Sequence, residues 1–295
     1  MFCLHKSINL GKLLLMNHRP NIPIDTVNLL PLLDQELLIL LRSLTPADWQ
    51  QPTIAKQWKV KDVAAHLLDG NIRSLSMLRD DFWGESFTGN DYQGLLDFLN
   101  GLNADWVKTM KRVSPAMLLL LHEATGKTYC DFYASLDPFG KAGFAVNWAG
   151  EEESKNWMHI AREYTEKWLH QQQIRDAVNQ PGHHFEREFF YPFIDTCLMA
   201  LPYTFRHIQP PHPVTVQITI TGHAGGSWYN HYANGQWQLS KEANANPTAA
   251  VTMDPDTSWR LFSKSLRPVD VLHKIRLEGD LELANTALEM VSFMA

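Results

Sequence analysis

The chain has 295 residues, of which 45% are apolar, so at about 150 residues per domain it can build two hydrophobic cores. This composition excludes a disordered chain. The chain has 32 acidic and 26 basic side chains, so its net charge is −6. This charge provides no general attraction to nucleic acid or to anionic membranes. We therefore expect neither a nucleic acid nor a membrane as a partner.

The three cysteines, Cys3, Cys130 and Cys197, are widely spaced and odd in number. They fit neither a disulfide framework nor a cysteine zinc site, which favours a reducing compartment and predicts a cytoplasmic protein. The first residues contain no signal-peptide cleavage pattern and no apolar run long enough to cross a membrane. We interpret residues 1–24 as an N-terminal extension.

Apolar residues recur at steps of three and four through the first two thirds of the chain, a pattern typical of amphipathic helices. Their spacing, with the proline and glycine stop signals, predicts helices over residues 25–44, 60–82, 92–112, 115–136, 151–179 and 187–205. The longest would begin at the acidic residues 151–153, which the positive end of a helix dipole favours. A proline cluster at 210–213 then predicts a domain edge.

Beyond this cluster the apolar period changes from 3.6 to 2, which predicts strands over 214–220, 228–232, 236–239, 249–253 and 275–278. Asn234-Gly235 is typical of a two-residue hairpin turn. Helices are expected over 254–266 and 281–294. The sequence therefore predicts a helical domain over residues 25–208, followed by an α+β domain over residues 209–295.

One pair of side chains on the longest predicted helix has the spacing of metal ligands. Glu166 and His170 are four residues apart, so they project from the same helical face. His159 and Glu163 form a second pair with the same spacing on nearly the same face. Such pairs are frequent on polar helices, so the spacing alone leaves the ligand assignment open.

A third candidate ligand is His66, which lies in an otherwise apolar stretch, Val-Ala-Ala-His-Leu-Leu. A lone histidine of this kind is more often a core residue satisfied by one hydrogen bond. Helical bundles, however, build metal sites from ligands that point inward from several helices. Two histidines and one carboxylate would leave a coordination position open, as a catalytic site requires.

These segments resemble a known family. Trp58-Lys-Val-Lys-Asp-Val-Ala-Ala-His66-Leu-Leu-Asp-Gly70 and Glu166-Lys-Trp-Leu-His170-Gln-Gln-Gln-Ile-Arg175-Asp-Ala are similar to the mycothiol-dependent maleylpyruvate isomerase family, within the DinB-like superfamily. The resemblance implies that His66, Glu166 and His170 bind a divalent metal, usually zinc. His159 and Glu163 match no ligand position of that family.

The C-terminal segments Ala250-Val-Thr-Met-Asp254 and Ile275-Arg-Leu-Glu-Gly279-Asp280 resemble the sterol-carrier-like domain of the same family. The fold implied is an N-terminal DinB-like four-helix bundle with a C-terminal sterol-carrier-like α+β domain. A long loop over 137–150 departs from the family pattern before the ligand helix. This loop can reshape the mouth of the site, so it bears on the identity of the substrate.

The resemblance implies an isomerase or S-transferase that uses a low-molecular-weight thiol, such as mycothiol or bacillithiol, and a small electrophilic substrate. A metal-bound thiolate would add to a double bond, and rotation and elimination would follow. Developing negative charge requires a nearby cation. The candidates are Arg73, seven residues after His66, and Arg260 and Arg267 of the second domain. For each, a solvated surface arginine is the competing interpretation.

Two other functions remain open. The same metal would make the protein a hydrolase if it activated water, which predicts activity without an added thiol. Alternatively, the C-terminal domain would bind an apolar ligand without catalysis. The sequence allows a monomer or a homodimer. We expect the remaining histidines, at 183–184, 207, 212, 223 and 231, to be solvated, and Trp148, Trp157 and Trp168 to be candidates for lining a cleft near the ligand helix.

Overall fold

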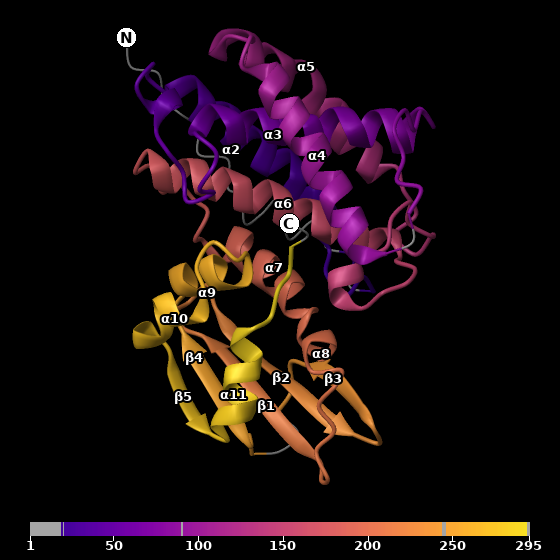
Figure 1. Ribbon diagram of the computed structural model, residues 1–295, viewed down its shortest axis with the longest axis vertical. Helices are drawn as coiled ribbons and strands as arrows, with labels where there is room; N and C mark the ends of the chain where they lie inside the picture. The colour runs from indigo at the N-terminus through magenta and orange to yellow at the C-terminus, as the bar shows by residue number, and fades with distance from the viewer. Residues whose placement is uncertain (1–18, 20, 90, 244–245, 294–295) are drawn as a thin grey trace.

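The computed structural model describes residues 19, 21–89, 91–243 and 246–293, and it has a helical part and a part built around a sheet (Figure 1). The helical part contains five long helices: α2 (Leu30–Ser43), α3 (Val60–Ser74), α4 (Tyr92–Met110), α5 (Pro115–Ala134) and α6 (Asn156–Ala177). Short 3-10 turns precede α2 at Val27–Leu29 and α3 at Asp48–Gln50. Among the described residues, no helix has both the length and the apolarity that crossing a bilayer requires.

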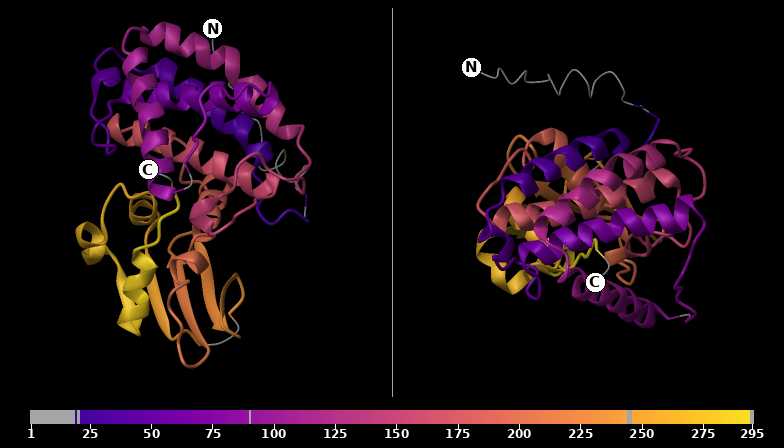
Figure 2. Two further views of the ribbon diagram at one scale, coloured as in Figure 1. Left: turned by 45° about the vertical axis from the view of Figure 1, so that its right-hand side comes forward. Right: turned by 90° about the horizontal axis from the view of Figure 1, so that it is seen from above.

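Helices α2, α3, α5 and α6 form the bundle. Helix α3 contacts α5 and α6, α2 contacts the same two helices, and α4 packs against α3 on the outside (Figures 1 and 2). The leucines that predicted the first helix face this core, and Leu33, Leu37 and Leu40 are each at most 2% exposed. The four-helix architecture expected for the N-terminal part is confirmed.

Most predicted helix boundaries agree with the structure to within a few residues, because local caps define them. Asp91 accepts a hydrogen bond from the amide of Gly94 at the start of α4, and Ser114 accepts one from Met117 at the start of α5. The second predicted helix is shorter than expected. Helix α3 ends at Ser74 and continues as a π-helical turn over Leu75–Arg79.

The start of the longest helix was predicted wrongly. Helix α6 begins at Asn156, so Glu151, Glu152 and Glu153 precede it in a loop. The hydroxyl of Ser154 accepts a hydrogen bond from the amide of Val146, 2.8 Å away, and this contact folds the loop back on itself. The loop buries Val146 and Trp148, whose 3-10 turn spans Asn147–Ala149. Burying these apolar side chains stabilises the loop instead of an earlier helix start.

The second part contains a five-stranded sheet with the order β3-β2-β1-β4-β5. Its strands are β1 (Val214–Ile220), β2 (Gly226–Ala233), β3 (Gln236–Ser240), β4 (Ala249–Met253) and β5 (Arg276–Gly279). Strands β1 and β4 are parallel, and the other neighbours are antiparallel. Asn234 and Gly235 both have positive φ, 53° and 79°, as the hairpin turn predicted between β2 and β3 requires.

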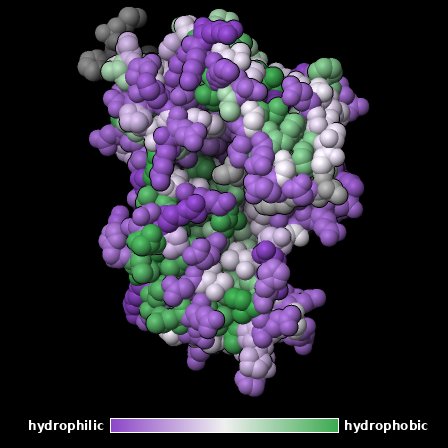
Figure 3. All heavy atoms as spheres, in the orientation of Figure 1, coloured by the Kyte–Doolittle hydropathy of each residue, from purple (hydrophilic) through white to green (hydrophobic). Residues whose placement is uncertain are grey.

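Three helices accompany the sheet: α9 (Pro255–Phe262), α10 (Pro268–Val271), which a 3-10 turn at Leu272–Lys274 follows, and α11 (Leu281–Leu288). Helix α11 contacts β1, β4 and β5 and so covers one face of the sheet (Figure 1). Apolar residues gather on the visible surface of this part (Figure 3). The exposed apolar residues of this part include Val269, Leu272 and Leu281. A helical part followed by an α+β part confirms the predicted fold class.

Helix α7 (Arg187–Leu198) and the short α8 (Leu201–Thr204) connect the two parts (Figure 1). The indole Nε1 of Trp228 on β2 donates a hydrogen bond to Asp195 of α7 across 2.8 Å. Arg260 of α9 forms an ion pair with Asp176 at the end of α6, with 2.6 Å between Nη2 and Oδ1. The sheet is therefore attached to α7, and α9 is attached to α6, the helix that carries Glu166 and His170.

The folded chain begins before residue 25. Ile22 and Ile24 are both buried, and the Arg19 guanidinium lies 2.6 Å from a carboxylate oxygen of Asp25. The last part of the predicted N-terminal extension therefore packs against the bundle. Residues 1–18 and residue 20 lie outside the described residues.

Candidate metal centre

Helix α3 positions His66 beside the bundle core. The Asp62 carboxylate accepts a hydrogen bond from the Lys59 amide at the start of this helix, 3.1 Å away. The neighbouring residues Val63, Ala64 and Leu68 are completely buried, and this packing fixes the rotation of the helix about its axis. His66 itself is only partly buried, so its ring lies at the edge of the core.

Helix α6 is buried on nearly all sides because it packs against α2, α3 and α7. From Met158 to Arg175, every residue of which the structure describes, only Arg162, Glu166 and His170 are not buried. They follow one another at steps of four, so they form a single stripe along the helix. Glu166 and His170, the predicted ligand pair, are therefore two of the three residues of this segment that keep contact with solvent.

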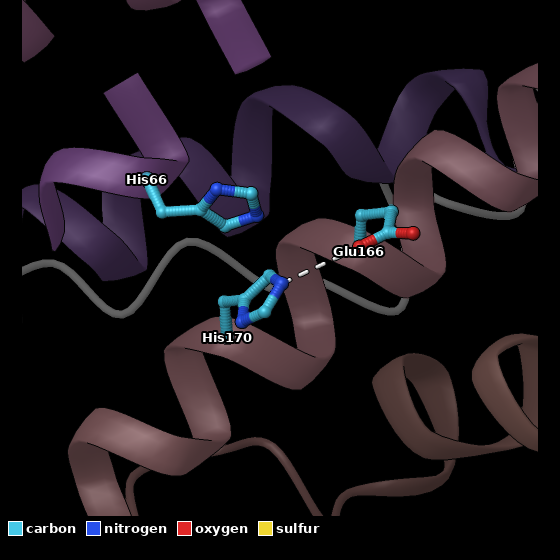
Figure 4. A group of neighbouring side chains, drawn as sticks. All are labelled: His66, Glu166 and His170. Atoms are coloured by element: carbon cyan, nitrogen blue, oxygen red, sulfur yellow. Dashed lines mark ion pairs between the residues drawn. The ribbon is translucent and has the colours of Figure 1, made fainter. Parts of the chain in front are cut away.

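The three predicted ligands meet at one point, as Figure 4 shows. One ligand atom from each of His66, Glu166 and His170 can be chosen so that all three lie within 4.8 Å of one another. The His66 and His170 ring centroids are 4.6 Å apart, and Oε2 of Glu166 lies 3.4 Å from Nε2 of His170. Tertiary packing brings together residues that are 100 positions apart in the sequence.

Neighbouring groups orient both histidine rings. Nδ1 of His170 lies 2.9 Å from Oε1 of Gln173, so the ring donates its Nδ1 hydrogen there and its Nε2 lone pair faces Glu166. The indole of Trp58 packs against the His66 ring, with 4.9 Å between the ring centroids. The buried Nδ1 of His66 has no hydrogen-bond partner among the described residues.

Burial sets the protonation state of His66. It lowers the pKa of this imidazole well below the usual value, and the nearby His170, Arg73 and Lys167 lower it further. The ring is therefore neutral at pH 7, as a metal ligand must be. Two neutral imidazole nitrogens and one carboxylate are donors that fit a divalent transition metal, and three protein ligands leave a position open for a further molecule.

The second helical pair, His159 and Glu163, lies in a different environment, one turn or more before the candidate ligands. His159 is 1% exposed, and its Nε2 lies 3.3 Å from the hydroxyl of Tyr133. Glu163 accepts a hydrogen bond from Tyr129 over 2.7 Å and contacts the Arg162 guanidinium. The pair belongs to a buried network of the bundle, and it is not part of the three-residue group in Figure 4.

The structure places the three predicted arginines at separate positions. Arg73 lies near His66, where its Nε is 2.9 Å from an oxygen of Asp69 and its Nη2 is 3.1 Å from Asn103. A cavity of about 260 Å³ adjoins this arginine, and Asp69, Glu85 and Asp105 are among its lining residues. A substrate role for Arg73 stays a prediction.

The other two predicted arginines lie in the C-terminal part, Arg260 on α9 and Arg267 directly before α10. Each guanidinium nitrogen of Arg260 donates to a carboxylate, Nε to Asp256 and both Nη atoms to Asp176. Arg267 is exposed at the start of α10. For both residues the structure shows no contact with the candidate ligands among the described residues, and their substrate roles stay predictions.

The predictions that tryptophans line a cleft and that His184 is solvated need correction. Trp168 does not line a cleft, because it is completely buried with its ring stacked 3.9 Å from that of Phe193. Trp148 is also part of the hydrophobic core, and the partly buried Trp157 packs against this core. His184 is not solvated: it is 0% exposed, and the Trp168 indole donates to its carbonyl oxygen.

Sequence reasoning missed the roles of Arg162 and Gln173. Arg162 precedes Glu166 by four residues and Gln173 follows His170 by three, so both lie next to a ligand on the helix surface. This spacing was the available signal. Which neighbour of a ligand actually reaches it depends on the packing of α6, which no local pattern contains.

Fold and site together define a protein with a helical bundle, an α+β part and a group of two histidines and one glutamate in the bundle. Residues 30–175 match the family model described as the mycothiol maleylpyruvate isomerase N-terminal domain. This match places residues 30–175 in that domain family. All three candidate ligands lie within the matched residues.

One solved structure extends the similarity in fold beyond that domain. A crystal structure of a mutant of mycothiol-dependent maleylpyruvate isomerase is similar with a TM-score of 0.50 and 9% identity, over 85% of this chain and 91% of that chain. A further crystal structure of mycothiol-dependent maleylpyruvate isomerase has a TM-score of 0.49 and 10% identity, over 81% of this chain and 88% of that one. No curated protein sequence matches the chain.

Proposed function

We propose that the protein is a metal-dependent enzyme that uses a low-molecular-weight thiol to isomerise a small electrophilic substrate or to transfer the thiol to it. In this proposal His66, Glu166 and His170 hold a divalent metal, with zinc as the expected ion. The observation that carries the proposal is the convergence of three ligand atoms within 4.8 Å, inside the domain that matches the isomerase family.

The residues of the chain have separate tasks in this proposal. His66 and His170 supply imidazole nitrogens, and Glu166 supplies the negative charge that partly balances a divalent cation. Gln173 holds the His170 ring in one tautomer, and Trp58 shields one side of the His66 ring from water. When bound, a divalent ion with an open position lowers the pKa of a coordinated thiol, so that the thiolate is available at neutral pH.

The thiol is expected to be mycothiol, because the matched family and the similar crystal structures carry that name. Bacillithiol is the other thiol to test.

The competing function, binding of an apolar ligand, would require a cavity for that ligand in the C-terminal part. The cavity between its helix α9 and the segment after α11, lined by Leu261, Leu266 and Met290 among others, holds about 20 Å³, the space of roughly one water molecule.

Metal analysis tests the site directly. We expect the purified wild-type protein to bind about one equivalent of zinc per chain, and H66A and H170A to lose most of it. The exposed His212 provides a matched control, since H212A removes an imidazole far along the chain from the ligands. Equal zinc contents in the wild type, H66A and H170A would show that these residues are not the ligands.

Turnover assays then distinguish the reaction types. The zinc-loaded protein is incubated with maleylpyruvate in the presence of mycothiol, bacillithiol, glutathione or no thiol. Isomerisation that requires one of the thiols supports the proposal. Hydrolysis of ester or amide substrates at equal rates with and without thiol supports the alternative, a hydrolase that uses metal-bound water.

A further inference from the structure

We infer that Arg162 binds a carboxylate group of the substrate, and so is a substrate-binding residue beside the candidate metal ligands. This inference rests on the proposed function, because it assigns a ligand chemistry to the same site. Arg162 lies on α6 one turn before Glu166, on the only stripe of that helix between Met158 and Arg175 that is not buried.

The two ends of the Glu166 carboxylate face different groups. Oε2 lies 3.4 Å from Nε2 of His170, and Oε1 lies 4.0 Å from Nη1 of Arg162. The guanidinium therefore adjoins the point where the three ligand atoms converge. At 4.0 Å it is too far from Glu166 to form a hydrogen bond, so its Nη1 hydrogens remain available to an oxygen acceptor of another molecule.

A buried neighbour holds this guanidinium in place. Nη2 of Arg162 contacts Glu163, and Glu163 is in turn fixed by the hydroxyl of Tyr129, 2.7 Å away. The Nε atom is buried and has no hydrogen-bond partner among the described residues. The side chain as a whole keeps 20% of its exposure, so it is anchored by Glu163 and is not completely enclosed.

The charge balance favours an anion at this position. Counted over Arg162, its partner Glu163, Glu166 and a divalent cation, the charges sum to +1. A guanidinium with free, fixed donors is well suited to a carboxylate, and its orientation requires little loss of side-chain entropy on binding. Arg73 is placed differently, because it forms an ion pair with Asp69 and donates a hydrogen bond to Asn103, and neither residue is a candidate ligand.

Binding of maleate to the zinc-loaded protein tests the inference without requiring turnover. Zinc content is measured first for every variant, and maleate affinity is then measured by calorimetry. We expect R162Q to retain zinc and to bind maleate at least about tenfold more weakly, because a charge-assisted hydrogen bond is lost. R162K should give an intermediate affinity. The exposed Arg276, which is paired with Glu278, supplies the control R276Q.

A double variant separates this role from a structural one. If Arg162 served only as the counter-ion of Glu163, R162Q/E163Q would remove the charge pair together and restore wild-type maleate affinity. We expect the double variant to bind maleate as weakly as R162Q. Unchanged affinity in R162Q, recovery in the double variant, or no maleate binding by the zinc-loaded wild type would overturn the inference. Failure of the wild type to bind zinc would instead contradict the proposed metal site.

Discussion

Gln173 and His170 form a hydrogen-bonded pair on one face of α6, in which the amide oxygen of Gln173 lies 2.9 Å from Nδ1 of His170. This contact assigns the ring hydrogen to Nδ1 and leaves the Nε2 lone pair facing Glu166. Residues that orient a ligand in this way commonly contribute tenfold to a hundredfold to metal affinity.

The first prediction follows from this contact. We expect Q173A to lower zinc affinity by about tenfold to a hundredfold, because the His170 ring loses its fixed tautomer. Q173E keeps an acceptor at the same position and should retain most of the affinity. Competition with a chromogenic chelator measures both. The exposed Gln57 gives the control Q57A, and an affinity for Q173A equal to that of the control would refute this role.

The second prediction concerns Arg260 and the connection between the two parts of the chain. Two Arg260 nitrogens lie 3.2 and 2.6 Å from the Asp176 carboxylate oxygens, and the arginine side chain is only 17% exposed. We expect R260Q to lower the free energy of unfolding by about 1 kcal/mol while zinc affinity and maleate affinity stay unchanged. Urea unfolding measures the first quantity.

The competing interpretation, a substrate-binding role for Arg260, predicts the opposite result. If it binds substrate, R260Q would weaken maleate binding with little effect on unfolding. The variant D176N provides a matched test, since it breaks the same ion pair from the other side. Equal losses of stability in R260Q and D176N would support the structural role.

The third prediction is a pH dependence of stability caused by His122. Burial lowers the pKa of this histidine to about 4, although its Nε2 donates a hydrogen bond to the Ala64 carbonyl, 2.9 Å away. In the unfolded chain the imidazole titrates near 6.5, so between pH 6.5 and 4 the unfolded state binds the proton more tightly. The stabilisation is complete above pH 6.5 and is lost as the pH falls towards 4.

The contribution of His122 can be isolated by substitution. Each such group changes the free energy of unfolding by about 1.4 kcal/mol per pH unit within this window. We expect H122Q to reduce the slope by roughly that amount, as measured by urea unfolding at several pH values between 4 and 7. H212Q, at an exposed histidine, should leave the slope unchanged. An unaltered slope in H122Q would contradict the assignment.

The fourth prediction distinguishes a core tryptophan from a cleft residue. Trp168 is completely buried and stacks on Phe193, so W168A should lower the free energy of unfolding by about 3–5 kcal/mol. Trp157 is only partly buried, and W157A should cost clearly less. Thermal or urea unfolding followed by circular dichroism measures both. Similar, small effects in the two variants would show that Trp168 is not a core residue.

Local sequence patterns were sufficient for most of the secondary structure. The strands β1 and β4 and the start of α5 lie where the alternation and the Ser114-Pro115 signal predicted them. Periodicity and capping involve residues only a few positions apart, so they can be recognised in the sequence. The start of α6 was missed, because the burial of Val146 and Trp148 by their loop outweighs the favourable acidic residues.

By itself, the sequence determined the fold class and the candidate ligand set of His66, Glu166 and His170. Helical spacing identified the Glu166 and His170 pair, and the apolar context of His66 made it the third candidate. The family resemblance then selected these three over His159 and Glu163. Only the tertiary structure decided that these residues meet, that α6 keeps Arg162 accessible beside them, and that carboxylates already occupy Arg260. The physical reason is that accessibility and charge pairing depend on how distant segments pack, whereas helix and strand formation depend on neighbours along the chain.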